Sequence, residues 1–281
     1  MTMNMDFQSS AWQLKMSRAR YLRSELEAIF IQYRTSNPIE IIDSDWDGVT
    51  MKVELHVRNS PEPSWGTIVG DIVHNYHSTL DSLYFALITH FAAKIEKPLT
   101  RWDQEHISFP IFDTPKSFAR RTKEVKKYGA LQILKDLESY QPFEYLSEHV
   151  PEEHAEHVLS GHPLKILRDL SNMDKHRSLH VIHFYLYTHA IGLPSGVTLK
   201  AASRPLYFPG QTKYSLSFEF EGASLDRKPD FVPHFKLGVL SGIGAPYTSD
   251  ILNLLQAIEG KISFIVHQLE YHFQPGFGTE P

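Results

Sequence analysis

Two polar stretches of the chain carry residue types that could do acid–base chemistry. The first lies in a run of helical spacing, residues 70–81, where His74, Asn75 and Asp81 fall on one stripe. A solvated helix face normally carries Lys and Glu, yet the only charged residue in the range 72–89 is Asp81. Short polar groups in this setting indicate a buried hydrogen-bond network or a site, and a plain solvated face is the alternative. The full stripe comprises Asp71, His74, Asn75, Ser78 and Asp81.

The second stretch lies further along the chain, where Asn172 and His176 share the polar face of another expected helix. His176 stands between Lys175 and Arg177, whose charges favour the neutral imidazole, whereas Asp174 opposes that effect. A near-neutral histidine beside two permanent cations suits proton transfer near a phosphate. The alternative is an ordinary helix C-terminus, where Lys, His and Arg interact favourably with the helix dipole.

Taken together, these two stretches resemble a bacterial family with a HEPN-like helical core. The HEPN signature is Arg, a polar residue that is often Asn, three variable residues and then His; here Asn172 and His176 match it, and Ser171 stands in place of the Arg. In that family the Arg is thought to hold the scissile phosphate, so Arg168 or Arg177 would have to substitute. The resemblance implies a helical bundle, a homodimer and metal-independent cleavage of RNA. His176 would then act as general base or acid at the 2′-hydroxyl or the leaving oxygen.

A run of basic residues provides a possible contact for an RNA backbone. The run follows Thr114-Pro115 and is expected to form a helix that ends near Gly129. Lysine and arginine on one helix neutralise phosphates without regard to sequence, and a solvated surface helix is the alternative. The candidate nucleic-acid contacts are Arg120, Arg121, Lys123, Lys126, Lys127 and Lys175.

Histidine clusters support a rival hypothesis, a metal-dependent hydrolase. The candidate groups are His176 with His180 and His183, His154 and His157 with Glu153 and Glu156, and His74 with His77 and Asp81. A strand through 179–187 would separate His176 from His180 by about 13 Å, at roughly 3.3 Å per residue, which is too far for one ion. No HExxH, Walker, Gly-x-Ser-x-Gly or GxGxxG motif occurs. The leading hypothesis is a homodimer that binds RNA or a nucleotide, with ribonuclease activity as its catalytic form, and it uses neither metal nor cofactor. A non-catalytic protein with a structural polar network is the third possibility.

Composition narrows the class of protein. The chain has 281 residues, a formal net charge of −5, 16 histidines and no cysteine. Without cysteine there are no disulfides and no thiolate nucleophile, and slight acidity argues against a sequence-blind DNA binder with a broad basic face. Residues 1–10 lack the features of a signal peptide. The longest stretch without Lys, Arg, Asp or Glu, 178–199, contains His, Gly and Pro, and is expected to form strands rather than a membrane span. We therefore expect a cytoplasmic protein.

Periodicity predicts the elements that position these residues, and the fold class is α+β: a bundle-like, HEPN-like helical layer packed with an antiparallel sheet. Residues 1–281 are expected to form one unit, mainly helical over 11–177, mainly strands over 178–245, and helical again over 248–273. A hairpin is expected at 39–57 around Asp47-Gly48. Expected helices cover 11–34, 64–97, 115–129, 130–140 and 162–175; expected strands cover 179–187, 197–202, 214–221 and 235–240. The predicted centre of activity is the meeting of the 71–81 and 168–177 helices.

Overall fold

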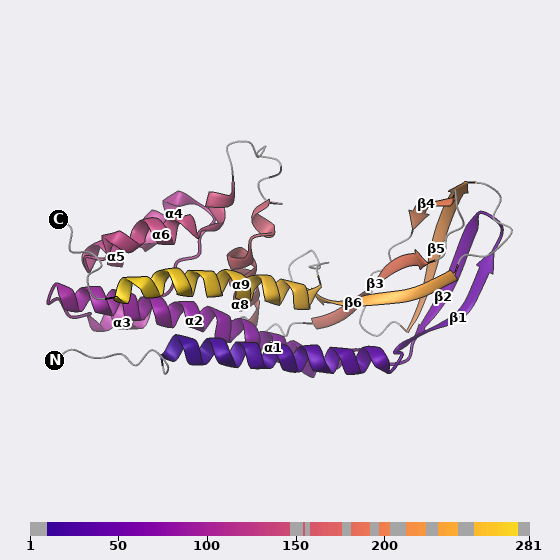
Figure 1. The fold of residues 1–281 in the computed structure, drawn as a ribbon, viewed down its shortest axis with the longest axis horizontal. Coiled ribbons are helices and arrows are strands. Elements are labelled where there is room, and N and C mark those ends of the chain that lie inside the picture. The colour runs from indigo at the N-terminus through magenta and orange to yellow at the C-terminus, as the bar shows by residue number, and fades with distance from the viewer. Residues whose placement is uncertain are drawn as a thin grey trace. The chain divides into compact units, whose positions relative to one another are not determined.

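The computed structural model describes residues 10–146, 154, 158–175, 181–191, 197–202, 212–222, 230–240 and 250–274. Within these residues the chain is α+β, as predicted (Figure 1). It divides into two compact units. The helical unit comprises Met1–Arg23, Val69–Ser178 and Leu254–Pro281, and the sheet unit comprises Ser24–Ile68 and Leu179–Asn253. The expectation that the whole chain behaves as one folding unit stays a prediction.

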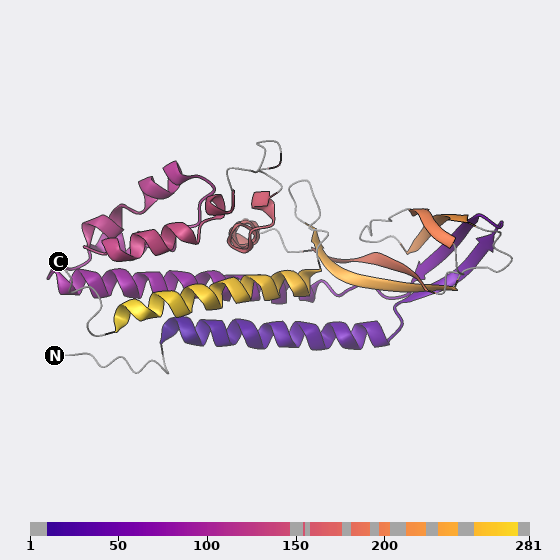
Figure 2. The same ribbon diagram turned by 45° about the horizontal axis from the view of Figure 1, so that its top comes forward.

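Three long helices contribute to the helical unit, and Figures 1 and 2 show α9 running beside α2 and the first part of α1. Their apolar sides form its core, where Leu83 and Leu87 of α2 and Ile262 of α9 have no exposed surface. The α-helices are α1 (Ala11–Thr35), α2 (Ser64–Lys94), α3 (Arg101–His106), α4 (Pro115–Arg121), α5 (Lys123–Lys127), α6 (Leu134–Ser139), α8 (Pro163–Lys175) and α9 (Ile251–Glu270). Short 3₁₀ turns are η2 (Leu131–Ile133), η3 (Pro142–Tyr145) and η4 (Tyr271–Phe273).

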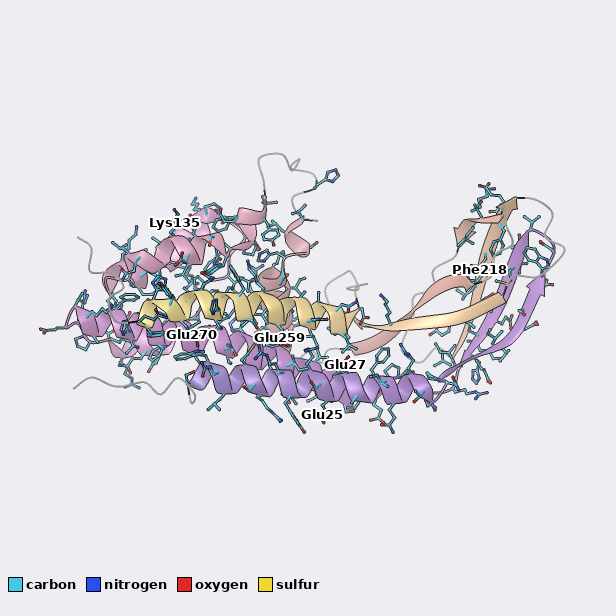
Figure 3. The ribbon with its side chains drawn as sticks, in the orientation of Figure 1. Glu25, Glu27, Lys135, Phe218, Glu259 and Glu270 are labelled. Carbon is cyan, nitrogen blue, oxygen red and sulfur yellow. The ribbon has the colours of Figure 1, made fainter. Side chains whose placement is uncertain are left out.

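The sheet unit contains two antiparallel sheets. One has the strand order β1-β2-β5-β4, and the other pairs β3 with β6. Buried and more exposed residues alternate along the second hairpin strand, where Val53 and Leu55 have no exposed surface and pack with Phe218 of β5, which is labelled in Figure 3. The strands are β1 (Ile39–Trp46), β2 (Thr50–Val57), β3 (Val181–Ile191), β4 (Val197–Ala202), β5 (Lys213–Gly222) and β6 (Asp230–Leu240).

The hairpin predicted at Asp47-Gly48 is confirmed, and its turn shows why those residues are needed. Gly48 has φ +95°, a region that glycine enters without steric cost. One carboxylate oxygen of Asp47 accepts hydrogen bonds from the backbone N–H groups of Val49 (2.9 Å) and Thr50 (2.6 Å). The turn therefore brings β1 and β2 together in the observed register.

The single basic helix expected over 115–129 is wrong. The chain forms two short helices instead, α4 and α5, which meet at Thr122. Thr122 has a non-helical backbone (φ −103°, ψ 26°), and its buried hydroxyl donates to the carbonyl of Phe118 at 3.0 Å. A threonine hydroxyl that bonds back to the preceding turn bends or interrupts a helix. The break interrupts the helix between Arg121 and Lys123.

Among the described helices, none is long and apolar enough to cross a membrane.

Candidate functional site

Helices α3, α4 and α5 and the segment 107–112 line a cavity of about 830 Å³ in the helical unit. It collects four of the predicted basic residues and several aromatic ones. The cationic lining is Arg120, Arg121, Lys123 and Lys127, and the ring-bearing lining is Trp102, His106, Phe109 and Phe112. Lys126 does not line the cavity, and the side chain of Lys175 lies outside the part of the chain that the structure describes.

The break at Thr122 explains how so many cations reach one cavity. Arg120 and Arg121 end α4, and Lys123 begins α5, so the three side chains flank the break. All three are exposed. Within the described residues, none of them forms an ion pair with a carboxylate. Their charges are therefore available to an anion.

An exposed tryptophan forms a flat surface at this cavity. Trp102 is 65% exposed, and its ring stacks on that of His106 with centroids 4.2 Å apart and planes 7° apart. The two residues are one helical turn apart on α3. Our sequence reasoning missed α3 and Trp102. The available signal was the capping box at its start, in which Thr100 and Asp103 cap each other.

Lys127 differs from the other cations because its amine is already engaged. Its Nζ donates to Asp103 at 2.6 Å, and Asp103 is only 3% exposed. Burial opposes ionisation of Asp103, but hydrogen bonds from Lys127, Thr100 and Tyr128 more than offset it, so the pKa of this carboxyl lies well below its ordinary range. Lys127 therefore ties α5 to α3 as well as lining the cavity.

Glu124 is the second carboxylate of the lining. Its Oε1 accepts a hydrogen bond from the hydroxyl of Tyr84 at 2.9 Å, and Tyr84 itself is fully buried. Burial raises the pKa of Glu124, and burial together with the Glu124 charge raises that of Tyr84. The four cations outnumber Asp103 and Glu124, so the cavity carries an excess of positive charge.

The wall segment 107–113 has no regular secondary structure and is held by side chains from other elements. Asp81 of α2 accepts from the N–H of Phe109 at 2.8 Å. The buried Gln141 accepts from the N–H of Phe112 at 3.0 Å and donates to the carbonyl of Pro110 at 2.9 Å. Side chains therefore supply the hydrogen-bond partners that a neighbouring strand would otherwise give this segment.

Arg168 secures the end of the same wall. Its guanidinium donates to Asp113 at 2.7 Å and to the carbonyl of Ile111 at 3.4 Å, and it also pairs with Asp169. Because its donors are shared among these partners, Arg168 is poorly placed to replace the arginine missing from the HEPN-like motif. Ser171, at that motif position, is 5% exposed, whereas Asn172 is exposed.

The polar stripe of α2 is not one buried network. His74 is exposed and lies 3.4 Å from the hydroxyl of Ser78 through its Nε2. Asn75 donates to the carbonyl of Asp71, on its own helix, at 2.7 Å. Among the described residues of the stripe, Asp81 is the one whose side chain bonds to another element, and its second oxygen lies 3.1 Å from Nδ1 of His77. His74 and Asn75 thus make local contacts only, among the described residues.

The predicted centre around His176 lies mostly outside the described residues. His176 and Arg177 lie outside the described residues, and Lys175 is described by its backbone alone. The proposed meeting of this motif with His74, Asn75 and Asp81 therefore stays a prediction.

The histidine clusters proposed as metal ligands also lie partly outside the described residues. In the part of the chain that is described, no group of three or more His, Asp or Glu could hold a metal ion. His157, His176 and His180 are not described, and His154 is exposed. Residues 181–191 form β3, so the strand expected beyond His180 is confirmed.

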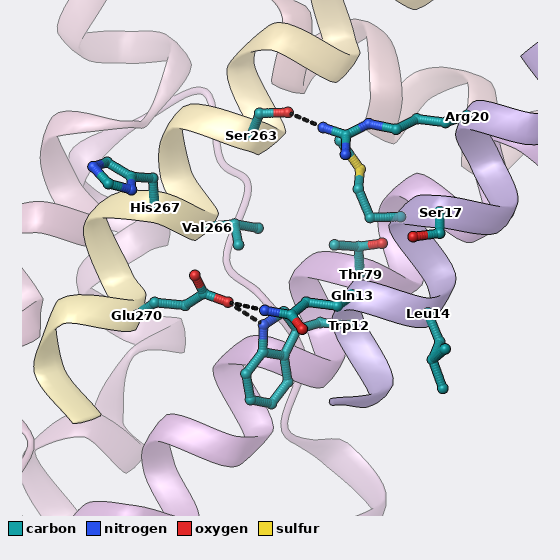
Figure 4. Close-up of a pocket in the computed structure, with 11 residues that line it drawn as sticks. Trp12, Gln13, Leu14, Ser17, Arg20, Thr79, Ser263, Val266, His267 and Glu270 are labelled. Atoms are coloured by element: carbon teal, nitrogen blue, oxygen red, sulfur yellow. Dashed lines mark hydrogen bonds between the residues drawn. The ribbon is translucent and has the colours of Figure 1, made fainter. Parts of the chain in front are cut away.

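A second cavity of about 430 Å³ lies between α1, α2 and α9 (Figure 4). Glu270 accepts hydrogen bonds there from Trp12 (2.7 Å) and Gln13 (3.0 Å). Arg20 donates to Ser263 at 3.0 Å and to Glu259, labelled in Figure 3, at 2.9 Å. Because its charged groups already bond to neighbouring side chains, this cavity offers less to a ligand than the cationic one.

Comparisons with protein-family models, with curated proteins and with solved structures found no match. Function must therefore be inferred from the geometry of the chain itself.

Proposed function

We propose that this protein binds RNA or a nucleotide in the cavity lined by α3, α4 and α5. One observation supports the proposal above the others. Three exposed cations that form no ion pair within the described residues, Arg120, Arg121 and Lys123, share a single cavity with the exposed ring of Trp102.

The two kinds of group match the two parts of a nucleotide. Arginine and lysine bind phosphate oxygens, and arginine can do so with two parallel hydrogen bonds. Any of the bases can stack on an exposed aromatic ring, and this stacking contributes about 1–3 kcal/mol per base. The volume of about 830 Å³ lies within the range of about 300–1,000 Å³ typical of small-molecule sites. A mononucleotide or one or two residues of single-stranded RNA would fit this chemistry.

The test measures the binding of a short oligouridylate through the change that it causes in the fluorescence of Trp102. Lys123→Ala should weaken binding and make the salt dependence shallower, by about 0.7 in the slope of log K against log salt for one lost phosphate contact. Lys126→Ala is the matched control, because Lys126 lies on the same short helix but does not line the cavity. Trp102→Phe identifies the fluorescence change that belongs to the cavity.

Equal losses in the Lys123 and Lys126 variants would mean that RNA binds a diffuse basic surface and not this cavity. No binding at low salt would remove the proposal. Ribonuclease activity, which the HEPN resemblance implies, is a separate step tested with total RNA in EDTA beside His176→Ala. Cleavage that survives this substitution would exclude His176 from the mechanism.

A further inference from the structure

One carboxylate in the lining of the cavity between α3, α4 and α5 is available to a ligand. Asp103 is not, because it already accepts hydrogen bonds from neighbouring side chains that include Lys127. Glu124 forms no ion pair within the described residues, and its Oε1 accepts from the hydroxyl of Tyr84 at 2.9 Å. A carboxylate offers about four lone-pair positions. Glu124 can therefore accept further hydrogen bonds from a bound molecule.

Buried aromatic residues hold this carboxylate in one orientation. Tyr84 comes from α2 and has no exposed surface. Its ring meets that of Phe109 edge to face, with centroids 6.0 Å apart and planes 80° apart, and Phe109 also lines the cavity. Because this packing fixes the Tyr84 hydroxyl, the bond to Glu124 restricts the rotamers that the carboxylate can adopt. A group that is oriented before binding loses little side-chain entropy when a ligand arrives.

The lining residues divide the cavity by charge. Arg120, Arg121 and Lys123 attract phosphate oxygens, whereas the carboxylate of Glu124 repels them. Burial raises the pKa of Glu124, and the Tyr84 hydroxyl and the charge of Arg121 act against burial by favouring the ionised form. The phosphate of a bound nucleotide therefore faces the cations. The part that faces Glu124 must supply hydrogen-bond donors from the base or the sugar.

Among the four RNA bases, guanine matches this acceptor best. Its Watson–Crick edge carries two adjacent donors, the N1–H and the 2-amino group, which can bond to the two oxygens of a single carboxylate. Adenine and cytosine each place an unprotonated ring nitrogen beside the amino group, and uracil has a carbonyl oxygen on each side of its N3–H. These acceptors would meet a carboxylate oxygen and be repelled, which discriminates against the three other bases.

We propose that the cavity selects guanine nucleotides and that Glu124 recognises the base. This inference rests on the proposed function, because contacts to phosphate and stacking on Trp102 bind any nucleotide and Glu124 adds a preference among them. One hydrogen bond to a charged group is enough to make GMP bind about tenfold more tightly than AMP. Tyr84 is a positioning residue, because it acts on the base through Glu124.

The test measures the dissociation constants of GMP, IMP, AMP and deoxy-GMP by isothermal titration calorimetry at low salt. IMP keeps the N1–H of guanine but lacks the 2-amino group, so its affinity should lie between those of GMP and AMP. Deoxy-GMP, which lacks the 2′-hydroxyl, should bind like GMP. Glu124→Gln should abolish the preference for GMP. In that variant the Tyr84 hydroxyl holds the amide oxygen, and the amide NH₂ that remains is a donor, which does not match guanine.

Three further variants make the test specific. Glu105→Gln is the matched control, because Glu105 is an exposed carboxylate on α3 that does not line the cavity, and it should keep the full preference for GMP. Tyr84→Phe keeps the buried ring and removes the hydroxyl, so it should reduce the ratio of GMP to AMP affinity without weakening AMP. Lys123→Ala should weaken all four nucleotides by the same factor, because it acts on the phosphate.

The results separate failure of this inference from failure of the proposed function. If no nucleotide binds, or if Lys123→Ala has no effect, the proposed function fails and guanine selection fails with it. Equal affinities for GMP and AMP that Lys123→Ala still lowers would mean that the cavity binds nucleotides without reading the base. A preference for GMP that survives Glu124→Gln would assign the recognition to another group. Loss of affinity in deoxy-GMP to the level of AMP would place the ribose, and not the base, against Glu124; either outcome overturns the proposal.

Discussion

Replacing Gln141 by leucine should lower the free energy of unfolding of the helical unit by about 3 kcal/mol. Gln141 has no exposed surface, and its amide makes hydrogen bonds to the N–H of Phe112, the carbonyl of Pro110 and the carbonyl of Leu137. Leucine has a similar volume but no polar atom, so Phe112 and Pro110 lose their partners inside the protein. Each buried polar group left without a hydrogen bond costs about 1–3 kcal/mol. Burial of the apolar leucine side chain offsets about 1–2 kcal/mol of this loss.

The measurement is urea-induced unfolding followed by far-ultraviolet circular dichroism. Gln104→Leu is the matched control, because Gln104 is exposed and, within the described part of the chain, its amide makes a single hydrogen bond, to the carbonyl of Leu99 at 3.3 Å. We expect the control to change stability by less than about 0.5 kcal/mol. If Gln141→Leu unfolds at the same urea concentration as Gln104→Leu, the wall of the cavity does not depend on this side chain and the reasoning fails.

Further predictions concern backbone strain and pH. Gly129 has φ +69°, and an added Cβ would lie 3.3 Å from Cγ2 of Ile95, so Gly129→Ala should cost about 1–2 kcal/mol in thermal denaturation. Gly260→Ala should instead stabilise α9 by about 0.5–1 kcal/mol, because its Cβ would meet nothing within 4 Å. Burial lowers the pKa of His162 to about 4 in the folded protein, whereas a value of about 6.5 is expected in the unfolded chain. The free energy of unfolding should therefore fall as the pH drops from about 6.5 to about 4. His162→Phe should flatten this part of the plot of stability against pH. Folding lowers the pKa of the Asp103 carboxyl, so its ionised form stabilises the folded state above about pH 4 and this stabilisation is lost on further acidification. Asp103→Asn should remove this pH dependence of the free energy of unfolding, measured by urea titration.

The elements with strong periodicity could be predicted from the sequence. The α1, α2 and α9 helices and the hairpin of β1 and β2 lie where apolar spacing and the Asp47-Gly48 turn placed them. The short elements could not, because their ends depend on single contacts. Thr122 would fit inside a helix by composition, and only its buried hydroxyl bond to Phe118 shows why α4 ends there.

The charged residues of the candidate site could be named from the sequence, but the cavity that they line could not be predicted. The basic run named Arg120, Arg121 and Lys123 correctly as neighbours, but a helical wheel cannot show that a break turns them toward one cavity. Trp102 had no partner visible in the sequence, since its role at the cavity depends on where α3 packs. The stripe containing His74 shows the converse: a regular pattern on one helix says nothing about whether another element covers it.

Two roles, one catalytic and one structural, can be assigned to the carboxylate of Asp81. The sequence predicted a catalytic residue from its place on the α2 stripe, and that role stays a prediction. The structure adds contacts that need no catalysis: one oxygen accepts the N–H of Phe109 in the cavity wall, and the other lies beside His77. Holding an amide N–H requires an acceptor but not a negative charge, whereas a general base requires a titrating carboxylate. Since the wall at Phe109 lines the cationic cavity, the observed contacts give Asp81 a structural role in holding this wall.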